Sequence, residues 1–177
     1  MANVKHYVLT AVILGSIAMV GGAIIGATHL ITKEQIKRNE AKKIDEGIKS
    51  LFGDDITRSD AIKIEGNDKY LDCYYVVNVN DTLKGYAFRT TGSNMYGKIS
   101  MLVGITTTYD IGHIYLVSNE QTYAQTLVDE YVTPYNSEDN HRELDDVSCG
   151  ATYGAKLIRE MANEAKDWAN TNLGGKA

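Results

Sequence analysis

A long run without formal charge near the N-terminus constrains this chain more than any other feature. Residues 7–32 are 26 consecutive positions without Asp, Glu, Lys or Arg. As an α-helix the run would be about 39 Å long, because each residue adds about 1.5 Å, and that length can span the hydrocarbon core of a bilayer. The apolar part of a cleaved signal peptide has only about 7–15 residues. We therefore expect a retained single-pass anchor in the lipid bilayer.

Small residues recur along the predicted anchor. Ala18, Gly22 and Gly26 are four residues apart, and the two glycines form a GxxxG pattern. This spacing lets a second helix approach closely, but glycine is also frequent in membrane helices generally. A partner helix and ordinary membrane-helix composition are both consistent with the pattern.

Basic residues flank the anchor on both sides. Lys5 precedes it, and five Lys or Arg residues follow within residues 33–43. A count of these charges would place the C-terminal part in the cytoplasm. The rule is weaker for long domains that are translocated, so the charges alone leave the orientation open.

The remaining residues, 33–177, have the size of one domain. With Lys5 set aside they carry 17 basic and 23 acidic residues, a net charge of −6. Such a domain has no positive field to bind nucleic acid by neutralising phosphates. Two cysteines cannot form a disulfide framework or a four-cysteine zinc site, and the four histidines form no HExxH motif. The glycine motifs of Rossmann and P-loop proteins are also absent.

Hydrophobic periodicity predicts an α+β fold for this domain. A stalk helix would place Ile44 and Ile48 on one apolar face and end at Gly53. Alternating strand patterns follow, and Asn80-Asp81 has the composition of a hairpin turn. The expected strands are 70–79, 83–90, 99–107 and 111–118, and the expected helices are 124–132, ended by Pro134, and 157–169.

The expected sheet is antiparallel or mixed and has flanking helices. Residues 1–32 would form the N-terminal segment and transmembrane anchor, and residues 33–66 the stalk and connection. Residues 67–177 would form the folded domain that carries any ligand site.

One short segment has the composition of a ligand-binding loop. Residues 149–154 read Cys-Gly-Ala-Thr-Tyr-Gly and precede the predicted terminal helix. Small neighbours leave Thr152 accessible, and backbone N–H groups at a helix N-terminus attract phosphate. The same residues would equally serve as an N-cap region, and spacing alone favours that interpretation because Gly-Ala-Thr is a short string.

The chain resembles the FMN-binding domain family typified by the G subunit of the Rnf electron-transport complex and the C subunit of the sodium-pumping NADH:quinone reductase. Its motif is Asp-x-x-Ser-Gly-Ala-Thr-x-Thr-Ser, which Asp146, Gly150, Ala151 and Thr152 match. The short chain is more similar to the Rnf subunit than to the longer C subunit. Further similarity lies in the membrane helix, the charged stalk and residues 85–86, 96–105 and 112–114.

The chain departs from the family pattern at three places. Cys149 replaces the usual serine, and residues 153–155 replace the usual x-Thr-Ser. The family block Glu-Thr-Pro-Gly-Leu-Gly is reduced to residues 121–126, in which only Thr122 is carried over.

The resemblance implies that a separate flavin transferase attaches FMN to Thr152 through a phosphodiester. No catalytic residue and no metal ligand is expected in the chain itself. The cofactor-binding residues expected from the resemblance are Thr152, Gly150, Ala151, Asp146, Tyr153, Cys149, Thr122 and Tyr96, with Tyr123 as a further candidate neighbour of the flavin.

In function, the resemblance implies an electron-carrier subunit of a membrane-bound, ion-translocating ferredoxin:NAD oxidoreductase, with other membrane subunits as partners. The folded domain would lie outside the cytoplasmic membrane, where the transferase acts. One alternative is the C subunit of a sodium-translocating NADH:quinone reductase. The other is a non-redox, membrane-anchored binding or assembly module that has lost its flavin, motivated by the departures at Cys149 and residues 121–122.

Overall fold

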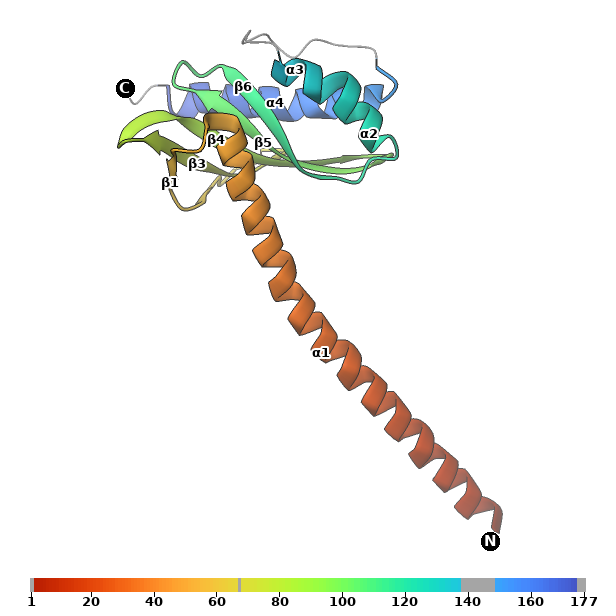
Figure 1. Cartoon of the computed structure of the whole chain (residues 1–177). Helices are drawn as coiled ribbons and strands as arrows, with labels where there is room; N and C mark the ends of the chain where they lie inside the picture. The colour runs from red at the N-terminus through yellow and green to blue at the C-terminus, as the bar shows by residue number, and fades with distance from the viewer. Residues whose placement is uncertain (1, 67, 138–148, 175–177) are drawn as a thin grey trace. The chain divides into compact units, whose positions relative to one another are not determined.

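The computed structural model describes residues 2–66, 68–137 and 149–174 (Figure 1). The chain divides into two compact units, Met1–Lys42 and Lys43–Ala177, which are described separately here. The fold is α+β, as the sequence predicts.

The first unit consists of helix α1 (Ala2–Phe52), which continues into the second unit. Within the described residues, His6–Ala23 is long and apolar enough to cross a membrane, with a mean hydropathy of 1.6. The large apolar side chains of this segment, such as Leu14 and Ile17, are exposed. An exposed apolar helix of this length is consistent with a single-pass membrane anchor.

The second unit is built on an antiparallel sheet in the order β1-β3-β4-β5-β6, with β2 also paired to β3. The predicted hairpin turn is confirmed. Asn80 and Asp81 join β3 to β4 with φ of 49° and 61°, the two positive values that a type I′ turn requires. The strands are β1 (Thr57–Arg58), β2 (Ile62–Lys63), β3 (Leu71–Val79), β4 (Thr82–Asn94), β5 (Gly97–Thr106) and β6 (Ile111–Asn119).

Strand β4 runs four residues beyond its predicted end at Thr90. It therefore turns directly into β5 through Met95 and Tyr96, which makes the four long strands one continuous meander. Gly97 closes this turn with a φ of 138°, and a side chain there would collide with the Glu120 carbonyl oxygen. Only glycine satisfies both conditions.

Both faces of the sheet are covered within the second unit. Helix α4 (Thr152–Asn172) runs along one face (Figure 1), where its Ile158 and Met161 pack with Phe88. The last turns of α1 cover the other face, where Ile48 packs with Val77. Burial on both sides explains why β5 is an almost continuous apolar run rather than an alternating one.

The segment between β6 and α4 differs from its prediction. It forms α2 (Ala124–Leu127), a π-helical turn η1 (Val128–Val132) and α3 (Thr133–Ser137). Pro134 therefore does not end the helical segment. It is the second residue of α3, which follows the π-helical turn without a break.

Candidate functional site

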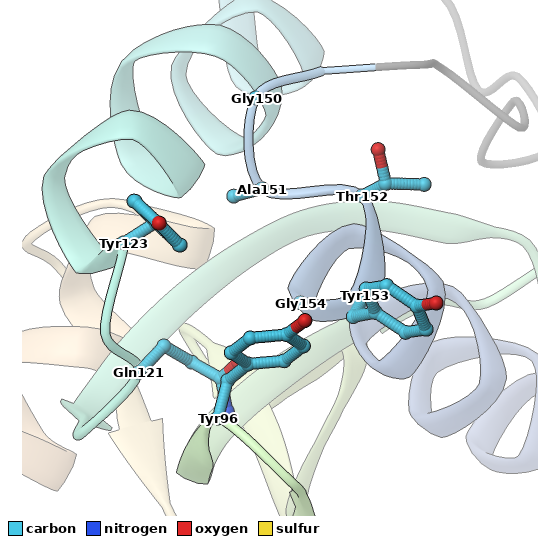
Figure 2. Close-up of a pocket in the computed structure, with 8 residues that line it drawn as sticks. All are labelled: Tyr96, Gln121, Tyr123, Gly150, Ala151, Thr152, Tyr153 and Gly154. Carbon is cyan, nitrogen blue, oxygen red and sulfur yellow. The ribbon is translucent and has the colours of Figure 1, made fainter.

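A pocket of about 200 Å³ lies where three segments of the second unit meet (Figure 2). The turn between β4 and β5 contributes Tyr96, and the loop after β6 contributes Gln121 and Tyr123. The remaining lining residues, Gly150, Ala151, Thr152, Tyr153 and Gly154, form the start of α4 and the loop before it.

Side-chain amides hold these three segments together. The Asn94 Oδ1 atom accepts hydrogen bonds from the Tyr96 N–H (2.8 Å) and from Gln121 Nε2 (3.1 Å), while Asn94 Nδ2 donates to the Tyr153 carbonyl at 3.1 Å. Gln121 Nε2 also donates to the Gly97 carbonyl at 2.6 Å. The pocket is therefore framed by polar contacts between the strand turn, the loop and α4.

Helix α4 begins without a side-chain cap. Ala151 occupies the N-cap position with φ of −119° and ψ of 42°, and no side chain bonds to the helix N–H groups there. The Thr152 hydroxyl is exposed and donates to the Cys149 carbonyl at 2.7 Å (Figure 2). An uncapped N-terminus carries partial positive charge and unpaired N–H donors, which attract an anion.

One carboxylate lies close to this end of the helix. Glu130 Oε2, from the π-helical turn, accepts a hydrogen bond of 2.9 Å from the Gly150 N–H. It thereby fixes the loop that precedes Thr152. The same carboxylate adds a negative charge beside the donors, so any anionic ligand has to be placed next to it.

Aromatic rings border the pocket. The Tyr96 and Tyr153 rings have centroids 5.3 Å apart and planes inclined by 40°. Tyr153 is 60% exposed and Tyr123 is 55% exposed, so both rings present free faces to an approaching molecule. Such faces suit a planar aromatic ligand or an apolar partner surface.

The structure brings together five of the eight predicted site residues. Tyr96, Gly150, Ala151, Thr152 and Tyr153 all line the pocket. The other three have different positions.

Cys149 adjoins the pocket and packs against the core on the α4 side of the sheet. Thr122 lies beside the pocket, between the lining residues Gln121 and Tyr123, and its N–H donates to the Tyr96 carbonyl at 3.0 Å. Asp146 lies outside the described residues.

Three residues of the site, Gln121, Gly154 and Glu130, were not among the predicted set. Gln121 is 7% exposed and central to the pocket, although the family comparison treats its block as degraded. Glu130 reaches Gly150 from 20 positions away. The place of Gln121 at the start of the block compared with the family motif was the available signal, whereas nothing in the local sequence points to Glu130.

Among the described residues, no three His, Cys, Asp or Glu side chains are grouped closely enough to hold a metal ion.

The fold and the pocket thus define an α+β domain with a small pocket lined by aromatic residues and a helix N-terminus, connected to an apolar helix of membrane-spanning length. Residues 1–46 match the family model described as the RnfG N-terminal region. This match covers most of α1 and none of the residues that line the pocket. No curated protein matches the chain.

Proposed function

We propose that this chain is the electron-carrier subunit of a membrane-bound, ion-translocating Rnf-type ferredoxin:NAD oxidoreductase complex, with FMN attached covalently to Thr152. The observation that carries the proposal is the exposed Thr152 hydroxyl at the uncapped start of α4, on the rim of an aromatic pocket. The match of residues 1–46 to the RnfG N-terminal region supports the same complex.

The residues present fit a phosphate-linked aromatic group. The hydroxyl needed for a phosphodiester is accessible, and Gly150 and Ala151 leave room around it. The first N–H groups of α4 can donate to phosphate oxygens. The pocket is smaller than the roughly 300–1,000 Å³ typical of sites that enclose a whole ligand, so it suits one part of a flavin.

Attachment requires a nucleophile, and the local geometry prepares one. The Thr152 hydroxyl proton is held by the Cys149 carbonyl, which leaves oxygen lone pairs free for a phosphorus atom. Attack on a flavin dinucleotide would form the Oγ1–P bond, break the diphosphate bond and release a nucleoside monophosphate, with the proton passing to a base of the transferase. Once bound, FMN supplies the redox chemistry, while the protein orients it.

Covalent attachment suits an electron carrier at a membrane. A tethered group cannot dissociate and has a high effective concentration at its partners. The anchor helix confines the domain to the bilayer surface beside the other membrane subunits. We place the domain on the outer side of the cytoplasmic membrane, where the flavin transferase acts.

Mass spectrometry of the chain co-expressed with a flavin transferase tests the proposal. We expect the mass of an FMN phosphodiester on the tryptic peptide 143–156, fragmented to Thr152. Thr152→Val should remove the adduct. Thr107→Val, which changes an exposed threonine outside the pocket, is the matched control and should retain it.

Colourless protein with an unmodified peptide contradicts the proposal, and so does an adduct that persists in Thr152→Val. An adduct on Thr152 in a complex with quinone-linked partners would instead identify the C-subunit role in a sodium-translocating NADH:quinone reductase.

A second candidate is a membrane-anchored binding or assembly module without flavin. The observation that favours it is the Glu130 carboxylate on the Gly150 N–H, which occupies a donor beside the expected phosphate position. Glu130→Gln separates the candidates, because it removes the negative charge and keeps an acceptor. Flavinylation that is absent in the natural chain and appears in Glu130→Gln would support the module.

A further inference from the structure

Gln121 is the only glutamine or asparagine among the eight pocket residues, and it is 93% buried. Both hydrogens of its amide group are used within the protein. Nε2 donates to the Gly97 carbonyl at 2.6 Å and to Asn94 Oδ1 at 3.1 Å. The side chain is therefore held in one position.

The backbone also determines which way the amide faces. The Gly97 carbonyl can only accept, so it requires the nitrogen of Gln121. Asn94 is oriented in turn by the Tyr96 N–H, which needs an oxygen, and by the Tyr153 carbonyl, which needs a nitrogen. Exchanging the oxygen and nitrogen of Gln121 would set two acceptors against each other, so the assignment is unambiguous.

The Gln121 Oε1 atom lies toward Gly154, another pocket-lining residue, because a Cβ atom built at Gly154 would be 3.5 Å from it. Within the described part of the chain, no protein group donates a hydrogen bond to Oε1. The atom is also not completely enclosed by protein. A buried amide whose oxygen has no donor within the protein is an acceptor available to a ligand donor, because a buried acceptor without a hydrogen bond is unfavourable.

The position of this acceptor indicates which part of a ligand it meets. Figure 2 shows Gln121 beside Tyr96, on the opposite side of the pocket from Thr152. A flavin attached by its phosphate at Thr152 would bring its ring system, not its phosphate, to that side. Tyr96 supplies an aromatic ring there, with its centroid 5.3 Å from that of Tyr153, and the oxidised flavin ring carries one N–H donor, in the imide between its two carbonyls.

We propose that Gln121 is a specificity-determining residue whose Oε1 accepts a hydrogen bond from the imide N–H of the flavin ring. The inference rests on the proposed function for the identity of the ligand. It makes the pocket selective for planar rings with an N–H donor.

Binding of two ring compounds to the full-length Thr152→Val chain in detergent tests this inference. Lumiflavin has the imide N–H, and 3-methyllumiflavin lacks it, while neither carries a phosphate. Quenching of flavin fluorescence gives both dissociation constants. We expect lumiflavin to bind about tenfold more tightly, the size of one net hydrogen bond.

Substitution of Gln121 should remove this preference. In a Gln121→Leu variant of the same chain the ratio of the two constants should fall to about one, whatever the loss of overall affinity. Gln125→Leu, which changes an exposed glutamine bonded to Asp129, is the matched control and should keep the tenfold ratio. Circular dichroism checks that each variant is folded.

The two dissociation constants of the Thr152→Val chain, which keeps Gln121, decide the outcome even if the Gln121→Leu variant does not fold. Equal affinity for the two compounds, or no binding of either, overturns the inference. The flavin adduct on Thr152 is measured separately, so the proposed function can stand when this inference fails.

Discussion

Cys73 and Cys149 lie on opposite faces of the sheet. Cys73 packs with the residues under α1, and Cys149 packs against the core under α4. A shift in register between Leu71 and Cys73 turns the strand, so that Leu71 faces α4 and Cys73 faces α1. The two thiols are free and separated by the sheet, so they do not pair within one chain.

The two thiols should differ in reactivity. Cys73 is 8% exposed and burial raises the pKa of its thiol, so little reactive thiolate is available. Cys149 is half-buried at the edge of the pocket. We expect a maleimide reagent to modify Cys149 at least tenfold faster in folded protein, measured by mass spectrometry over time.

Single substitutions check the assignment of the two phases. Cys149→Ser should remove the fast phase, and Cys73→Ser should leave it unchanged. In denaturant both thiols should react at similar rates. A fast phase that survives in Cys149→Ser would mean that Cys73 is accessible.

At the residue scale, the sequence predicted most of the residues that line the pocket, but not the hydrogen bonds that hold its segments together. Thr152, Gly150 and Ala151 are contiguous, so a short motif sufficed to find them. The contacts of Gln121 with Asn94 and Gly97 join residues up to 27 positions apart. Such pairings depend on where β4 turns into β5, which a single sequence does not specify.

At the level of elements, prediction succeeded where the chemistry is local. Asn80-Asp81 tolerates positive φ and marked the hairpin correctly. The π-helical turn at Val128–Val132 carried no such signal, because it depends on how the segment packs. Pro134 was predicted to end the helix, but the helical segment continues through it to Ser137.

Helix α1 meets the sheet at a glycine, and this contact is testable. A Cβ atom at Gly47 would lie 2.5 Å from Tyr115 Cδ1 and 2.7 Å from Leu102 Cδ1. Alanine would gain about 1 kcal/mol in helix propensity but would overpack the contact, which costs typically 1–3 kcal/mol. We expect Gly47→Ala to lower the free energy of unfolding by about 1 kcal/mol, and Gly47→Leu to prevent folding.

Chemical denaturation followed by circular dichroism measures this effect. Ser50→Ala, at an exposed position three residues further along α1, is the control and should change stability by less than about 0.5 kcal/mol. A Gly47→Ala variant that is more stable than the wild type would show that α1 can move away from the sheet at little cost.

For the molecule as a whole, α1 serves two different environments. Its first part is apolar on all sides, whereas residues from Lys43 onward carry an apolar stripe that closes the core of the second unit. A single helix thus provides both an apolar segment of membrane-spanning length and one layer of the folded domain. This dual use predicts that the position of a truncation decides whether the domain survives.

Two truncated chains separate these roles. Residues 43–177 keep Ile44 and Ile48, which are 6% and 0% exposed, and should fold as a soluble domain. Residues 54–177 lose both, and the sheet face with Val77 and Leu102 becomes exposed. Burying each isoleucine contributes about 1.5–3 kcal/mol, a large share of a typical stability of about 5–15 kcal/mol. We expect the shorter chain to be unfolded or aggregated.

Cell fractionation and thermal unfolding distinguish the outcomes. The full chain should sediment with membranes, and residues 43–177 should remain in the supernatant with one cooperative transition. As a control, Ile44→Asp with Ile48→Asp in the 43–177 chain should reproduce the loss seen in residues 54–177, because it removes the same apolar contacts without shortening the chain. A stable, monomeric 54–177 domain would contradict the argument, since it would mean that the sheet needs no cover on that face.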